Sequence, residues 1–178
     1  LKKKPEIFEM GLSTKDIKQQ YEFAKNLLDK EIRIHEIFKQ GQFIDIHAVT
    51  KGKGLQGAVK RFGVTLKSHK SEKKRRSAGN LGSWTPKKVS FRIPQKGQMG
   101  YHTRTEFNKL IVDIGTSPEK INPKDGFPHY GLVQADYILI KGSIPGPQKR
   151  LIRFAEAFRN HKSIPIDINY ISVESKQR

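Results

Sequence analysis

The side chains best able to do chemistry in this sequence are cationic, and they gather in one segment. Fifteen basic residues lie between Lys51 and Arg104, where Glu72 is the only acid, so this segment carries +14 of the net charge of +18. Lysine and arginine at this density favour a polyanionic partner. A charge run is more often a solvated face or a disordered tail, but this run is internal and is followed by predicted strands.

The same segment carries residues that suit an RNA partner. It holds eight glycines, which allow a close approach of the backbone to a ligand. It also holds aromatic and imidazole rings that can stack on unpaired bases, at His69, Trp84, Phe91, Tyr101 and His102. Without phosphates nearby the segment would repel itself, so we expect it to fold on its RNA and to release counterions.

The predicted RNA-binding residues share a cationic, imidazole or indole side chain. They are Lys51, Lys53, Lys60, Arg61, Lys67, His69, Lys70, Lys73, Lys74, Arg75, Arg76, Trp84, Lys87, Lys88, Arg92, Lys96, His102 and Arg104. Within this set, the residues expected to contact phosphates most directly are Lys53, Arg61, Lys73, Lys74, Arg75 and Arg76, and Trp84 is expected to stack.

One motif favours an enzyme instead. Gly52, Gly54 and Gly57 have the G-x-G-x-x-G spacing of a dinucleotide-binding turn, and Glu72 lies 20 residues after Gly52. However, Glu72 does not end a second apolar strand, and Gly63 interrupts the helix that should follow. The sequence therefore disfavours a nucleotide-dependent enzyme, although the glycines could still pack backbone amides against an RNA phosphate.

Other catalytic and metal-binding patterns are missing from the sequence. It has no H-E-x-x-H, no G-x-S-x-G, no P-loop and no cysteine, and its six histidines are scattered singly. We therefore predict no catalytic residue, no metal, no cofactor and no small-molecule substrate. No stretch approaches the roughly 20 apolar residues of a membrane span, and LKKKPEIFEM does not lead into a signal peptide, so we predict a cytoplasmic protein without a membrane partner.

The secondary structure around these residues is predicted to consist mainly of strands. Ser13 and Asp16 resemble a weak capping box before an amphipathic helix over 14–29, and residues 54–62 could form one or two helical turns. Apolar runs bounded by glycine and proline predict strands, over 43–49, 89–93, 106–115, 135–144 and 168–173. A helix in front of several strands favours a mainly β fold, an antiparallel sheet or barrel, over a doubly wound one.

Several motifs, in order along the chain, resemble large-subunit ribosomal protein three in its archaeal and eukaryotic form. The similarity begins at Phe38 and runs through Asp45, Ala48, Thr50, Gly52, Lys53, Gly54, Gly57 and Arg61. It continues in LGSWTP (81–86), GQMGYHTRTEFNK (97–109), INPKDGFPHYGLV (121–133) and KGSIPGPQKRLIRF (141–154). The resemblance covers residues 38–178. Relatives begin with basic, glycine-rich residues and barrel strands that nothing matches here before the helix, so the chain resembles a partial copy.

This resemblance implies an antiparallel β-barrel of the translation-protein type, with a small α/β insertion and a long irregular basic loop. Residues 1–37 would form the helical insertion, and residues 38–178 the barrel, interrupted by the basic loop over 63–90. The resemblance also implies partners, namely large-subunit ribosomal RNA and neighbouring large-subunit proteins, and a place on the cytoplasmic ribosome. The loop would reach toward the peptidyl transferase centre with Trp84 at its tip, and His69 would be the candidate for methylation.

One alternative of another class stays open at this stage. A general nucleic-acid-binding protein, such as a chromatin or single-strand protein, would share the charge but would not need a glycine-rich loop of this length.

Overall fold

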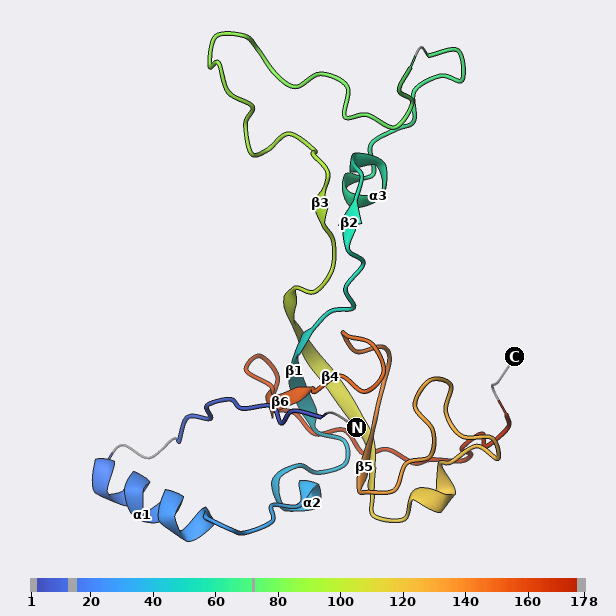
Figure 1. Cartoon of the computed structure of the whole chain (residues 1–178). Helices are drawn as coiled ribbons and strands as arrows, with labels where there is room; N and C mark the ends of the chain where they lie inside the picture. Colours follow the sequence, from blue (N-terminus) through green and yellow to red (C-terminus); the bar gives the residue numbers. More distant parts are fainter. Residues whose placement is uncertain (1–2, 13–15, 72, 176–178) are drawn as a thin grey trace. The chain divides into compact units, whose positions relative to one another are not determined.

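The computed structural model describes residues 3–12, 16–71 and 73–175 (Figure 1). The chain divides into two compact units. The first unit comprises Leu1–Ile44, Asn108–Gly142 and Ala157–Arg178. The second comprises Asp45–Phe107 and Ser143–Glu156, and it contains every predicted RNA-binding residue. None of the described helices is both long enough and apolar enough to cross a membrane.

The first unit begins with short helices. Helix α1 spans Ile17–Leu27, within the predicted range, and Asp16 caps it by accepting a hydrogen bond from the backbone N–H of Lys18 at 3.0 Å. The predicted partner in the cap, Ser13, lies outside the described residues. Helix α2 spans Ile34–Ile37. Neither helix buries a residue.

The main sheet has four strands in the order β5-β4-β1-β6, drawn together in Figure 1. These strands are β1 (Phe43–Val49), β4 (Thr103–Gly115), β5 (Tyr137–Ile140) and β6 (Arg153–Glu156). A 3-10 helix, η1, spans Pro118–Lys120. The predicted strands over 43–49, 106–115 and 135–144 are thus confirmed as β1, β4 and β5.

The alternation in β1 explains its place in the core. Ile44, Ile46 and Ala48 are buried on the apolar side of the strand, and Asp45 is buried on the opposite side. In the first unit, Ile44 and Ile111 are completely buried. Beside them, β4 pairs antiparallel with β5, with a register irregularity between Ile111 and Asp113.

The pairing of Gly115 with Tyr137 anchors β5 on β4. A Cβ on Gly115 would lie 2.4 Å from the Tyr137 ring, so the glycine is what lets this ring lie across the neighbouring strand. The Tyr137 hydroxyl donates a 3.4 Å hydrogen bond to Asp113 Oδ2. Burial, together with the nearby Asp113 carboxylate, raises the pKa of Tyr137 above its ordinary value.

The second unit adds three short elements between β1 and β4. Strand β2 (Leu55–Gln56) pairs antiparallel with β3 (Gly97–Gln98), and helix α3 (Ala58–Phe62) follows β2 directly. Helix α3 confirms the predicted helical turns and ends at Gly63, whose φ of 69° is the left-handed conformation that favours glycine. Between α3 and β3, the described residues form no helix and no strand, as Figure 1 shows.

Two strand predictions are wrong. Residues 89–93 form a turn, in which the Ile93 N–H donates to the Ser90 carbonyl at 3.2 Å, and Pro94 next to it has no N–H to donate to a ladder. Residues 168–173 have the apolar pattern of a strand, but they pair with no other strand in the described structure. Conversely, β2, β3 and β6 were not predicted, because two to four residues are too few for an alternation to be recognised.

The described chain is therefore mainly β with few helices, as predicted. Its strands form one open four-stranded sheet and one two-stranded sheet, and no closed sheet occurs among the described residues.

Candidate nucleic-acid interface

A two-stranded ribbon, residues 50–56 paired with residues 97–102, carries the segment between α3 and β3. Beyond the β2–β3 pairs, the N–H of Lys53 donates to the Met99 carbonyl at 2.8 Å and the N–H of Met99 donates to the Gly54 carbonyl at 2.9 Å. Nearer the sheet, the N–H of Thr50 donates to the His102 carbonyl at 2.9 Å. These bonds hold the ribbon in one register, so its side chains have fixed positions.

Gly100 is the point of closest approach within this ribbon. Its φ is +72°, and a Cβ at this position would lie 2.0 Å from the backbone oxygen of Lys51. Only glycine fits here without movement of the facing strand. The glycine at position 100 is therefore explained by backbone contact.

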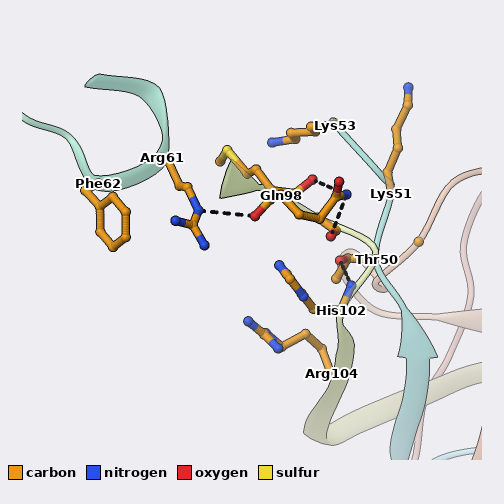
Figure 2. Close-up of a pocket in the computed structure, with 11 residues that line it drawn as sticks. Thr50, Lys51, Lys53, Arg61, Phe62, Gln98, His102 and Arg104 are labelled. Atoms are coloured by element: carbon orange, nitrogen blue, oxygen red, sulfur yellow. Dashed lines mark hydrogen bonds between the residues drawn. The ribbon is translucent and has the colours of Figure 1, made fainter. Parts of the chain in front are cut away.

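The ribbon borders a hollow of about 550 Å³, which we call the stem hollow (Figure 2). Its cationic and imidazole side chains come from both strands and from α3: Lys51, Lys53, Arg61, His102 and Arg104. None of the eleven described residues that line it is acidic. In Figure 2, Arg61, His102 and Arg104 point toward the same space. Such a cluster can bind phosphate groups, because no carboxylate in its lining offsets its charge.

Arg61 differs from the other four because its guanidinium already holds the protein together. Its Nε donates to the Gln98 carbonyl at 3.2 Å and its Nη1 to the Gln95 carbonyl at 3.0 Å. The guanidinium also packs against Gly97, where a Cβ would lie 2.9 Å from Nη1. Arg61 joins α3 to β3 in this way, which uses two of its five N–H groups; its predicted role as a phosphate ligand stays a prediction.

Four consecutive cations lie together on the loop itself. Lys73, Lys74, Arg75 and Arg76, with Ser77, line a shallow hollow of about 520 Å³. The loop turns back on itself there: the N–H of Lys67 donates to the Arg75 carbonyl at 3.2 Å, and Arg75 Nε donates to the Lys67 carbonyl at 3.4 Å. Lys73 adopts a φ of 59° in this turn.

Trp84 lies on a turn without a core around it. The N–H of Lys87 donates to the Trp84 carbonyl at 2.9 Å, and 87% of Trp84 is exposed. A buried core tryptophan is thereby excluded, and the indole faces are open for stacking.

Half of the predicted RNA-binding residues lie in two clusters, and the other half are spread along the chain. The stem hollow brings together five of them and the 73–76 turn four. The others lie apart along α3 and the irregular segment: Lys60, Lys67, His69, Lys70, Trp84, Lys87, Lys88, Arg92 and Lys96. All eighteen are exposed except Arg61, which is half-buried.

Several residues of the site were not predicted, most of them because they carry no charge. Thr50, Phe62, Gln98, Met99 and Gly146 also line the stem hollow. Arg150, from the loop before β6, was missed as well: its guanidinium carbon lies 5.5 Å from the centre of the Tyr101 ring. Gln98 and Met99 could have been found from the sequence, because they lie within the motif at 97–109. Gly146 and Arg150 could not, because only the fold brings them to the ribbon.

The structure around the G-x-G-x-x-G motif is not that of a dinucleotide site. Strand β2 lies within the motif, between Gly54 and Gly57, and pairs antiparallel with β3, while α3 has only five residues, so no β-α-β unit surrounds the motif. Glu72 lies outside the described residues. Within the described part of the chain, no three histidine, aspartate or glutamate side chains are grouped as a metal site would require.

Comparison with known proteins decides the family. The family model described as ribosomal protein L3 matches residues 1–178, the whole chain. The chain belongs to the ribosomal protein L3 family. The resemblance of the sequence motifs is thereby confirmed, and the match extends beyond the expected residues 38–178 to residues 1–37.

Members of this family with the name large ribosomal subunit protein uL3 are similar over 99% of this chain. The Methanothermobacter thermautotrophicus protein is 50% identical, and the match covers 54% of its length. The Methanopyrus kandleri protein is 45% identical with 50% of its length covered, and the Methanocorpusculum labreanum protein 46% with 54% covered. The chain thus spans about half the length of the curated relatives that it matches.

Proposed function

We propose that this chain acts within a large-subunit ribosomal protein as a structural, non-catalytic RNA-binding part. The observation that supports this most is the stem hollow, where Lys51, Lys53, His102 and Arg104 lie around one space whose lining holds no acid. Family membership supplies the class of RNA, since the relatives are named as large ribosomal subunit proteins. The RNA would be large-subunit ribosomal RNA, and the location the cytoplasmic ribosome, beside neighbouring large-subunit proteins.

The proposed binding mode has two parts. The ribbon would hold a phosphate-binding surface in fixed geometry, while the basic loop, 63–90, would become ordered between RNA helices as its charge is neutralised. Trp84 would stack at the loop tip, which we propose extends toward the peptidyl transferase centre. The four-stranded sheet would form part of a translation-protein barrel spanning residues 38–178, with residues 1–37 as a helical insertion.

The test compares RNA binding by matched charge variants. The first variant carries Lys51→Gln, Lys53→Gln and Arg104→Gln, and the control carries Lys18→Gln, Lys25→Gln and Lys30→Gln, which removes the same charge from exposed positions in and beside α1. Affinity for a transcript of the large-subunit RNA 3′ domain is measured across a salt series. Circular dichroism verifies that all three proteins are folded.

For the first variant, which we call the stem variant, the slope of log affinity against log salt concentration should become shallower by about 2. Each phosphate contact on a single strand contributes about 0.7 to this slope. The control slope should stay within error of the wild type. Equal slopes in the stem variant and the wild type would contradict the proposed phosphate surface. Equal affinity for the transcript and for duplex DNA of the same length would favour a general nucleic-acid-binding protein instead.

A further inference from the structure

A third hollow, of about 610 Å³, lies within residues 81–93, and we call it the tip hollow. Its wall is mainly apolar, with one charged residue in the lining: Leu81, Pro86, Val89, Phe91 and Ile93, together with Lys88. These side chains have no core to join. Leu81 is 50% exposed and Val89 45%, so the segment keeps apolar surface open that a folded chain ordinarily buries.

Local hydrogen bonds give the tip hollow its frame. The N–H of Lys87 donates to the Trp84 carbonyl at 2.9 Å, and the N–H of Ile93 donates to the Ser90 carbonyl at 3.2 Å. These two turns lie on either side of Lys88 and Val89. The apolar wall is thus formed by a chain that folds back twice.

Phe91 provides a flat surface at this hollow. Its ring is among the most exposed in the described chain, at 90%, and the guanidinium carbon of Arg92 lies 5.7 Å from the ring centre. An arginine over a ring occupies at most one of its faces. The other face is available to a planar ligand.

The charge around the hollow decides which planar ligand fits. Residues 73–105 contain no aspartate or glutamate, while Lys87, Lys88 and Arg92 lie beside the apolar wall. A ligand with a flat apolar face and an attached negative charge satisfies both features, and a nucleotide is such a ligand. An apolar protein segment would cover the wall but leave the cations unneutralised.

We propose that the tip hollow holds one unstacked nucleobase of a single-stranded RNA segment, stacked on Phe91, with its phosphate beside Lys88. This inference rests on the proposed function, because RNA must first bind the loop. It adds a base-binding site to a surface that otherwise recognises phosphates, and a site distinct from the exposed indole of Trp84.

The test uses two probes with the same number of phosphates. One is a twelve-nucleotide oligoadenylate with a central 2-aminopurine, and the other is an abasic ribose-phosphate oligomer of equal length. Binding is measured in a Trp84→Ala background, so that stacking on the indole does not mask the tip hollow. We expect the oligoadenylate to bind about tenfold more tightly than the abasic oligomer, as one stacked base provides. The 2-aminopurine fluorescence should rise, because the base leaves the stack of its neighbours.

Phe91→Ala should remove most of this preference and most of the fluorescence increase, and should leave the affinity for the abasic oligomer unchanged. The matched control is Phe158→Ala, which removes a ring that is 82% exposed in the other unit, and it should change neither probe. Equal affinities for the two probes before Phe91 is changed would overturn the inference, as would equal effects of Phe91→Ala on both probes. In either case, an apolar protein segment becomes the better candidate for the occupant of the tip hollow. The proposed function fails separately, when the ribosomal RNA transcript shows no salt-dependent binding.

Discussion

Two glycines of the ribbon have left-handed backbone conformations, but only one of them also lies against the facing strand. Gly54 and Gly100 have similar positive φ values, +66° and +72°. A Cβ on Gly54 would meet nothing within 4 Å, whereas a Cβ on Gly100 would lie 2.0 Å from the Lys51 oxygen. The first position requires only a left-handed conformation, while the second also requires the facing backbone to move.

Gly100→Ala should therefore destabilise the protein more than Gly54→Ala. The left-handed conformation alone costs of the order of 1–3 kcal/mol for a non-glycine residue, and the contact with Lys51 adds to that cost at Gly100. Urea unfolding of both variants measures the difference. Equal midpoints for the two variants would show that the ribbon is looser than the structure has it.

Tyr137 predicts how stability changes at alkaline pH. Burial and the nearby Asp113 raise its pKa in the folded state, so the neutral phenol is favoured there over the unfolded state. This contribution is fully present below the unfolded pKa of about 10 and is lost as the pH rises through the folded pKa. Relative to Tyr137→Phe, the wild type should lose stability above about pH 10. A difference that stays constant from pH 8 to pH 11, measured by urea unfolding, would contradict the buried phenol.

At the scale of elements, the ribbon depends on α3 through Arg61. Arg61→Lys keeps the charge but cannot reproduce both hydrogen bonds to the Gln95 and Gln98 carbonyls. We expect amide hydrogen exchange at Lys53 and Met99 to become about tenfold faster. The control is Lys60→Arg, on the exposed side of α3, which should leave exchange unchanged. Unchanged exchange in Arg61→Lys would show that β2 and β3 pair without this side chain.

The elements that the sequence predicted well are those with strong local patterns. The apolar runs of β1, β4 and β5 and the capped helix α1 carry their own period, so their positions could be predicted. The run 89–93 carries a similar pattern but has no neighbouring strand to pair with, and pairing is not encoded within five residues. Strands β2 and β3 exist because the chain returns to itself after some forty residues, which no local pattern reveals.

At the candidate site, too, local features could be predicted from the sequence and long-range contacts could not. Charge and ring type identified Lys51, Lys53, His102 and Arg104 from the sequence, because phosphate binding requires cations. The structural role of Arg61 could not be predicted, since it depends on two backbone carbonyls more than thirty residues away. Uncharged lining residues such as Gln98 and Gly146 were missed for a similar reason.

At the scale of the whole molecule, the positive charge and the irregular backbone occur in the same part of the chain. The segment 51–104 carries +14 of the +18, and most of it has neither helix nor strand. A segment with this composition buries too little apolar surface to offset its conformational entropy alone. The energy that orders it would come from an RNA surface with the opposite charge.

Amide hydrogen exchange of the chain, with and without the large-subunit RNA transcript at low ionic strength, tests this claim most directly. We expect fast exchange in residues 63–96 of the free protein. On RNA addition, we expect exchange to slow strongly in residues 50–56 and 63–104, with little change in α1 or in residues 157–175. Slow exchange throughout 63–96 in the free protein, with no further slowing when RNA is added, would contradict this claim.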